Sequence, residues 1–257
     1  MRKTLVAVCV LMSAISHSRA AAQTTAVRID RQPVIDGRIE ESWIPGRLFD
    51  AFVQIEPDID RHATLRTEVS FLYDRGTVFL AARMTQPKDT MRSSRSRRDS
   101  AVAANGDYVA FFLDPAASGN AAYFFLVNPS NAIQDGILDA SGARTTQWDG
   151  RFASAVQVDE EGWSVEIAVP LDALDFQSRP VQQWGILCER YYAQEKRRFV
   201  SRLVDENRPF EIASFHRLLD LRDLERAKRH AVTPYAFAAA TSHADSVTSR
   251  AETGVDL

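Results

Sequence analysis

GDYVAFFLDPAASGNAAYFFLVN, residues 106–128, is the stretch from which the fold class follows. Successive side chains of a strand point to opposite faces, and both faces are apolar in the runs 108–113 and 121–127. Residues 115–120, between the two runs, contain the proline, glycine and asparagine that favour turns. The stretch therefore predicts an antiparallel hairpin at the centre of a sheet that is covered on both sides.

The segments around this hairpin show further strand patterns. Residues 67–73 alternate apolar and polar side chains and 77–84 run back after a turn, which predicts a second hairpin. Other short strands are expected at 27–30, 33–35, 133–138, 148–158, 163–169, 183–190 and 214–221. Strands this short and numerous, separated by turns, predict an all-β protein with an antiparallel β-sandwich of the jelly-roll kind.

A few short helical turns are expected between the strands. Residues 38–43 place Ile39 and Trp43 on one face of a helical turn, so Trp43 is expected to plug one end of the core. Pro170 stands at the start of the second turn, 170–174, where proline is well tolerated.

The first residues have the three parts of a secretory signal. Two basic residues precede the apolar run 5–12, and small residues follow up to residue 22. The apolar run is too short to span a bilayer, so residues 1–22 are expected to be cleaved on export. Cys188 is the one cysteine outside this leader and cannot form an internal disulfide; its apolar context predicts a buried strand position. An exported protein without disulfides suits the periplasm or outer membrane of a Gram-negative bacterium.

The composition of the 257 residues, 45% hydrophobic and 25% charged, is that of a globular protein. The leader carries three basic residues and no acidic one, so its removal changes the formal charge from −3 to −6. A mildly acidic exported protein is a poor candidate for binding nucleic acid.

The tail differs from the rest of the chain. Residues 241–253 are polar, and 254–257 resemble the start of a strand that would have no partner. We therefore expect three parts: a signal peptide at 1–22, a sandwich at 23–230, and a tail at 231–257 that is the front of something longer.

Sequence motifs for catalysis are lacking. There is no Gly-x-Ser-x-Gly elbow and no His-Glu-x-x-His helix, and the histidines are scattered. The acidic run Asp159–Glu161 has the carboxylates that a glycosidase needs, but on a tight turn they would not face each other across a cleft. We expect a protein that is not an enzyme.

The order of the motifs resembles the family 9 carbohydrate-binding modules, specifically the copy ahead of an outer-membrane β-barrel in a family of bacterial proteins. The resemblance covers residues 27–221 and is carried by 33–37 (PVIDG) with Glu41 and Trp43, 71–74 (FLYD), 97–99 (RRD), Asp107, 113–114 (LD), 125–128 (FLVN), 148–150 (WDG), 162–170 (GWSVEIAVP), Leu174, 184–186 (WGI) and Arg190. It implies a β-sandwich that binds oligo- or polysaccharide, and a C-terminal outer-membrane barrel of which residues 254–257 would be the opening. An unclosed edge cannot sit in lipid, so such a barrel needs many more strands than this chain holds.

The resemblance also implies sugar contacts that this sequence has lost. Sugar-binding members carry an aromatic residue before the central strand, a glutamate within it and an arginine in the next strand. The corresponding positions here are approximately Ala104, Ala110 and Leu126. The sequence therefore leaves two main hypotheses, a carbohydrate-binding module with a relocated site, or a docking module that binds no sugar; a carbohydrate-degrading hydrolase is a remote third.

Polar and aromatic residues at strand ends and loops are the candidates for a relocated site, because sugars are bound by aromatic faces and fixed polar groups. The alternative for the arginine-rich loop 91–99 is a solvated segment with a local Arg98–Asp99 contact, and for Trp148 a half-buried edge position. The predicted ligand-binding residues are Arg97, Arg98, Asp99, Asp107, Asn128 and Trp148.

No cofactor is required by the sequence, although calcium is possible because some relatives of the family carry it. Its oxygen ligands would come from Asp36, Glu40 and Glu41, or from Asp172 and Asp175. Neither spacing follows a known calcium loop, and acidic residues at turns ordinarily act as capping groups.

Overall fold

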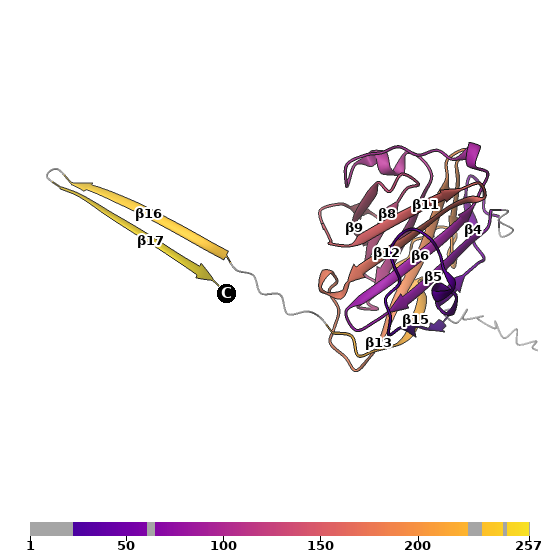
Figure 1. Ribbon diagram of the computed structural model, residues 1–257, viewed down its shortest axis with the longest axis horizontal. Helices are drawn as coiled ribbons and strands as arrows, with labels where there is room; N and C mark the ends of the chain where they lie inside the picture. The colour runs from indigo at the N-terminus through magenta and orange to yellow at the C-terminus, as the bar shows by residue number, and fades with distance from the viewer. Residues whose placement is uncertain (1–22, 61–64, 226–232, 244–245, 257) are drawn as a thin grey trace, which may run out of the picture.

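The computed structural model describes residues 23–60, 65–225, 233–243 and 246–256, so the expected signal peptide lies outside the described residues. Two β-sheets pack face to face and confirm the predicted all-β sandwich (Figure 1). The helical segments within these ranges are short 3-10 turns, and none is long and apolar enough to cross a membrane.

The larger sheet has nine strands in the order β1-β15-β13-β7-β8-β9-β10, with β14 paired to β13 and β4 to β14. β1 runs parallel to β15, and the other neighbours are antiparallel. The strands are β1 (Gln23–Thr25), β4 (Val53–Glu56), β7 (Tyr108–Asp114), β8 (Ala121–Val127), β9 (Ile133–Asp139), β10 (Arg144–Thr145), β13 (Val181–Tyr192), β14 (Arg197–Val200) and β15 (His216–Arg222).

The smaller sheet has six strands in the order β11-β12-β6-β5-β2, with β3 also paired to β5. Its strands are β2 (Val27–Arg28), β3 (Arg47–Phe49), β5 (Thr67–Tyr73), β6 (Thr77–Thr85), β11 (Ala153–Asp159) and β12 (Gly162–Pro170). The predicted β5–β6 hairpin is confirmed, with Phe71 opposite Leu80.

The central hairpin forms as predicted, with Val109 of β7 opposite Val127 of β8. Every residue of β7 is buried. Phe111 and its neighbours on the inner face join the core between the sheets, while Phe112 and Phe124 on the outer face are covered by side chains from 200–215. Burying one such side chain stabilises the fold by about 1.5–3 kcal/mol, which explains why this hairpin organises the sheet.

The N-terminal segment differs from expectation. Residues 33–35 form no strand, and the helical turn is η1 (Glu41–Gly46), which leaves Ile39 exposed. Trp43 is buried, but it packs on the outer face of the smaller sheet against Leu72 and Phe79 rather than plugging an end of the main core. The reason is a specific contact: the Trp43 indole N–H donates to the buried Glu166 Oε1 at 2.7 Å.

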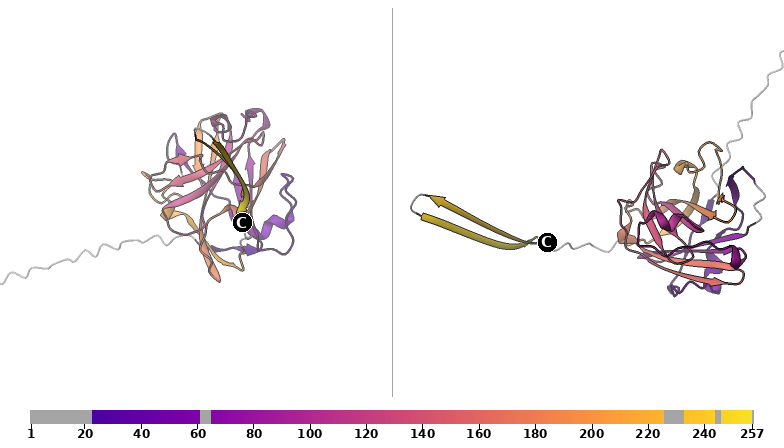
Figure 2. Two further views of the ribbon diagram at one scale, coloured as in Figure 1. Left: turned by 90° about the vertical axis from the view of Figure 1, so that its left-hand side faces the viewer. Right: turned by 90° about the horizontal axis from the view of Figure 1, so that it is seen from above.

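Other boundaries also differ. The strand expected at 148–158 begins only at residue 153, and β3, β4 and β14 are not predicted from the sequence. β16 (Thr233–His243) and β17 (Ser246–Asp256) pair with each other as a separate two-stranded ribbon (Figures 1 and 2). Residues 254–256 therefore complete β17 instead of starting a further strand.

Candidate functional site

Arg98 is the centre of the polar cluster that the sequence singles out. Its Nε and Nη2 donate to the two carboxylate oxygens of Asp135 at 2.9 and 2.8 Å, and Nη2 also contacts the Gly150 carbonyl and, at 2.9 Å, Asp149 Oδ1. Its guanidinium lies 5.0 Å from the centre of the Phe152 ring. Arg98 thus ties the arginine-rich loop to β9 and to the segment before β11, and its main partner is Asp135 rather than Asp99.

Burial and hydrogen bonding act in opposite directions on the pKa of each partner of the Arg98–Asp135 ion pair. Burial raises the pKa of Asp135, while the hydrogen bonds from Arg98 and the Gly150 N–H act in the opposite direction. Burial disfavours the charged form of Arg98, but the hydrogen bond to Asp135 and the surrounding carboxylates outweigh it and raise its pKa. The ion pair therefore connects the arginine-rich loop to β9 and to the segment before β11.

The remaining predicted residues are divided between the loop and the strand ends. Asp99 adopts a left-handed backbone (φ 57°) and accepts the Asp135 N–H at 3.0 Å, whereas Arg97 is exposed. Asp107 is fully buried and accepts the Arg92 N–H at 2.8 Å. Asn128 is also fully buried and holds the loop through its amide, which donates to the Ser94 carbonyl at 2.9 Å. Asp107 and Asn128 stabilise the loop and present no polar atom to solvent.

Trp148 lies at the edge of the sandwich, half-buried. Its ring packs against Tyr123 at 4.8 Å and Phe125 at 5.9 Å. A pocket of about 460 Å³ lies beside it, lined by Trp148, Asp149, Gly150, Arg151, Asp172 and Ala173. Of the predicted set, the structure therefore brings together Arg98, Asp99 and the Trp148 segment.

The carboxylates that lie close enough together to hold a metal ion are not the predicted calcium ligands. Within the described ranges, the carboxylates whose ligand atoms lie within 4.8 Å of one another are those of Asp99, Asp135 and Asp149. The Arg98 guanidinium contacts all three of them. A cation of the protein itself thus lies among these carboxylates, and a calcium ion would compete with it there.

Two of the three positions at which the resemblance implies sugar contacts, 110 and 126, lie on the outer face of the nine-stranded sheet. Ala110 and Leu126 are register partners there and are fully buried. Glu189 of β13 lies opposite Ala110. Its buried carboxylate accepts the Tyr108 hydroxyl at 2.7 Å and the Arg144 Nη2 at 2.5 Å, and it lies 3.3 Å from Arg198 Nε. Burial, followed by the charge of Glu189, raises the pKa of Tyr108.

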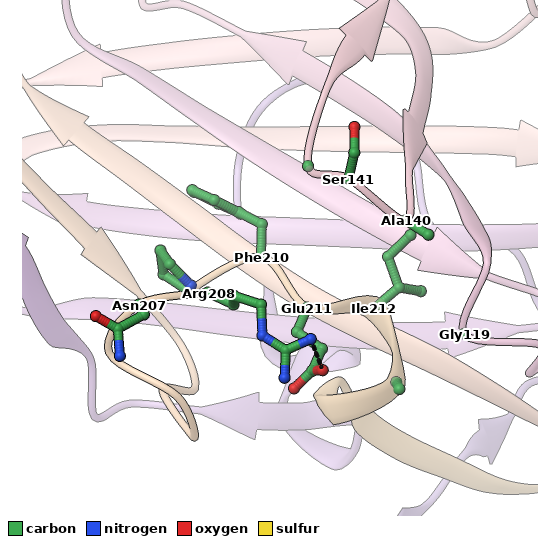
Figure 3. A pocket seen from close by; sticks show the side chains of 11 residues that line it. Gly119, Ala140, Ser141, Asn207, Arg208, Phe210, Glu211 and Ile212 are labelled. Atoms are coloured by element: carbon green, nitrogen blue, oxygen red, sulfur yellow. Dashed lines mark ion pairs between the residues drawn. The ribbon is translucent and has the colours of Figure 1, made fainter.

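A pocket of about 420 Å³ opens on this side of the sandwich, between the β9–β10 turn and residues 207–213 (Figure 3). Phe210 is the aromatic residue in its lining, and its polar side chains include Asn207 and the ion pair between Arg208 Nη1 and Glu211 Oε1, 2.7 Å apart. We call this the Phe210 pocket; its other lining residues are Gly119, Ala140, Ser141, Gly142, Pro209, Ile212 and Ala213. An aromatic ring beside fixed polar groups suits a saccharide.

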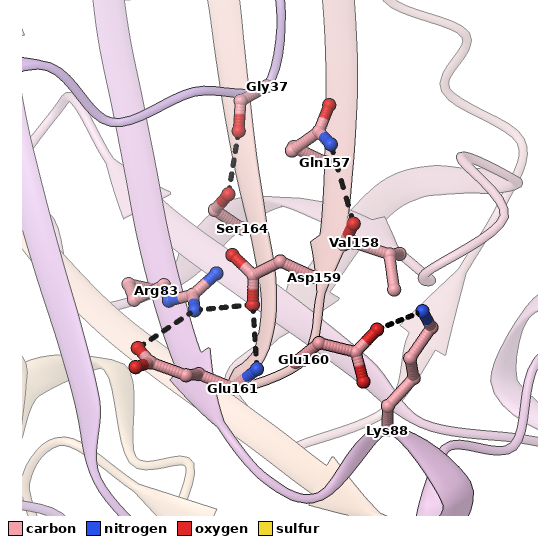
Figure 4. Close-up of polar contacts among 9 residues, drawn as sticks. All are labelled: Gly37, Arg83, Lys88, Gln157, Val158, Asp159, Glu160, Glu161 and Ser164. Carbon is pink, nitrogen blue, oxygen red and sulfur yellow. Dashed lines mark hydrogen bonds and ion pairs between the residues drawn. The ribbon is translucent and has the colours of Figure 1, made fainter.

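The acidic turn between β11 and β12 has each of its three carboxylates paired with a basic side chain (Figure 4). Asp159 pairs with Arg83 at 2.7 Å, and Glu160 pairs with Lys88 at 2.5 Å. The hydrogen bond from Arg83 lowers the pKa of Asp159, the direction opposite to that of a glycosidase acid.

Sequence reasoning missed Asp135, Glu189, Arg144 and Phe210. Asp135 lies 37 positions from its partner Arg98, and Glu189 lies 45 positions from Arg144 and 81 from Tyr108, so no local spacing marks these residues. An acidic residue next to the apolar positions of a predicted strand, as in 133–138 and 183–190, is the signal that could have found the two carboxylates.

The fold is that of the family 9 carbohydrate-binding modules. Two structures of such a module from Caldicellulosiruptor kristjanssonii, in complex with cellotriose and with glucose, are 16% and 14% identical to this chain, each with a TM-score of 0.56. They cover 83% and 81% of this chain and 98% of their own. A candidate carbohydrate-binding protein from Bacteroides uniformis is 12% identical, with a TM-score of 0.57, covering 77% of this chain and 98% of its own. No family model and no curated protein matches the sequence.

Proposed function

We propose that this protein is a non-catalytic carbohydrate-binding module that holds its saccharide in the Phe210 pocket. The observation that carries the proposal is the pairing of the Phe210 ring with the Arg208–Glu211 ion pair and Asn207 around one cavity. Sugar rings stack their C–H faces on aromatic rings, while charged and amide groups orient the hydroxyls. The saccharides bound by the Caldicellulosiruptor module, cellotriose and glucose, support this class of ligand.

The cellular setting is part of the same proposal. The leader-like residues 1–22 support export to the periplasm or outer membrane, and the resemblance to modules that precede an outer-membrane barrel supports a role as the periplasmic N-terminal part of such a polypeptide. The module would present envelope or environmental glycan to the barrel. Sequencing the gene beyond codon 257 tests this: a stop codon without barrel-like sequence downstream would remove the barrel partner from the proposal.

Binding of the mature protein to soluble plant and bacterial oligosaccharides, including glucose and cellotriose, tests the function. We expect saturable binding in isothermal titration calorimetry, with and without calcium, and a loss of at least tenfold in affinity for Phe210→Ala. Trp148→Ala tests whether the pocket beside Trp148 binds the sugar instead. Val34→Ala, at an exposed site on the N-terminal segment, is the control. Binding lost in Trp148→Ala but kept in Phe210→Ala would place the site at Trp148.

A docking module without sugar binding is the second candidate. It is favoured by the burial of Ala110 and Leu126, since the family's polar sugar contacts are replaced there by an apolar, closed surface. No heat of binding across the whole panel, from a protein that unfolds cooperatively, would select this candidate over the first.

A further inference from the structure

The Phe210 ring rests on a charged side chain from another part of the sheet. The Arg144 guanidinium, from β10, lies 4.9 Å from the centre of the Phe210 ring and 4.8 Å from that of Phe112. The two rings are 5.7 Å apart. Arg144 is therefore packed against a fully buried phenylalanine and against the phenylalanine that lines the pocket.

Arg144 is itself held by the buried Glu189. The carboxylate accepts its Nη2 at 2.5 Å, and Tyr108 and Arg198 complete the surroundings of the same carboxylate. Glu189 is fully buried on β13, a central strand paired to β7 and β14. A charge-assisted hydrogen bond to a fully buried partner holds the Nη2 end of the guanidinium more firmly than an exposed pair would.

Phe210 belongs to a segment without strand pairing. It lies between β14 and the 3-10 turn η5 (Ile212–Ser214), and the backbone hydrogen bonds beside it are local ones, from Arg208 N–H to the Asp205 carbonyl and from Glu211 N–H to the Arg208 carbonyl. The position of the ring consequently depends on the side chains against which it packs, Arg144 and Phe112.

We propose that Glu189 is a positioning residue: acting through Arg144, it sets the position of the Phe210 ring in the Phe210 pocket. This proposal rests on the proposed function for its consequence, because a ring that is displaced by a fraction of its width loses its stacking contact with a sugar. It also explains how this face can present an aromatic platform although the family's contacts at 104, 110 and 126 are lost.

The position of the ring can be measured without any sugar. A single 4-fluorophenylalanine at position 210 of the mature protein gives one ¹⁹F resonance, whose chemical shift reports the surroundings of the ring. Arg144→Met and Glu189→Gln should each move this resonance towards the solvent-exposed value. Arg197→Met, on β14 and paired with Glu195, is the matched arginine control and should leave the shift unchanged.

The double variant tests the order of action. If Glu189 acts through Arg144, Arg144→Met with Glu189→Gln has the same ¹⁹F shift as Arg144→Met alone, because the effects of coupled residues do not add. An unchanged resonance in Arg144→Met, with near-ultraviolet circular dichroism showing a folded protein, would overturn the proposal. Arg144→Met keeps the test decisive even if Glu189→Gln fails to fold.

Oligosaccharide titrations then separate this proposal from the proposed function. Where the panel contains a ligand, Arg144→Met should weaken its binding about tenfold, and should have no further effect in a Phe210→Ala background. Unaltered affinity in Arg144→Met would overturn the positioning role while leaving sugar binding intact. A moved resonance with no ligand in the whole panel would support the positioning role and count against the proposed function.

Discussion

Glu189 of β13 lies directly opposite Ala110 of β7, so a carboxylate stands one strand away from the position at which sugar-binding relatives are expected to carry a glutamate. The two positions share the outer face of the sheet, and the Glu189 carboxylate is already saturated by Tyr108 and Arg144. A glutamate at position 110 would therefore meet a carboxylate of like charge rather than a free site.

Ala110→Glu should accordingly destabilise the protein instead of restoring sugar binding. Directly opposite residues of an antiparallel pair have Cβ atoms about 4.5–5.5 Å apart, where two buried carboxylates repel. Ala110→Gln has the same size without the charge and is the control. We expect a lower urea midpoint for the glutamate variant than for the glutamine variant at pH 7, and equal midpoints would show that the face is more open than the contacts indicate.

Loss of the Arg98 side chain should destabilise the fold. Calcium should not change the stability of the parent protein. Arg98→Met removes the guanidinium that pairs with the buried Asp135 carboxylate, which should lower the free energy of unfolding by about 3 kcal/mol. Arg97→Met removes an exposed arginine next to it and should change the free energy little. In the parent protein, calcium or EDTA should leave the thermal midpoint unchanged, since the Arg98 guanidinium already contacts Asp99, Asp135 and Asp149; a calcium-dependent midpoint would contradict this.

The N-terminal segment should detach when Glu166 loses its charge. Glu166 accepts the backbone N–H groups of Asp36 and Gly37 at 2.9 and 2.7 Å as well as the Trp43 indole. The amide of Glu166→Gln offers one acceptor oxygen instead of two, which costs about 1–3 kcal/mol. Hydrogen exchange of residues 33–46 should accelerate, with residues 108–127 as the internal reference; uniform acceleration of both would indicate global destabilisation instead.

His216 should make the protein sensitive to mild acid. Burial, with a smaller contribution from Arg202, lowers its pKa from 6.5 to about 4, and its Nε2 lies 2.8 Å from Thr24 Oγ1. Between these two pKa values the unfolded chain binds a proton that the folded protein does not, so stability falls as the pH drops from 6.5 to about 4. The urea midpoint of His216→Gln should fall less than that of the parent over this window, and parallel curves would refute the assignment.

The parts of the fold that were predictable are those whose own residues dictate burial. In β7 and β8 both faces are apolar, so a covered hairpin followed from the side-chain pattern alone. β4 and β14 have four residues each and no long apolar run, and they become strands because they pair with each other and β14 pairs with β13. Trp43 shows how a tertiary contact can override a local pattern. Its position is set by the hydrogen bond from the indole to the Glu166 carboxylate, and the i, i+4 spacing from Ile39 does not predict it.

The candidate site was less predictable than the fold. Arg98, Asp99 and Trp148 were predictable as a polar and aromatic set near strand ends, but their assembly around Asp135 depends on β9, which lies far along the chain. Phe210 stands in a segment without periodicity, and only the tertiary structure brings Arg144 beneath it. Contacts between side chains that are far apart in the chain leave no spacing in the sequence.

The parallel pairing of β1 with β15 has a consequence for engineering. Gln23 and Arg217 are register partners, so the first and last strands of the sandwich are neighbours at one edge of the nine-stranded sheet. Because the two strands run parallel, the start of β1 lies beside the start of β15, and the end of β15 at Arg222 lies five residues further along, about 17 Å at 3.3 Å per residue. A circular permutant of the sandwich should therefore need a linker of at least about five extended residues that runs back along this edge from the end of β15 to the start of β1.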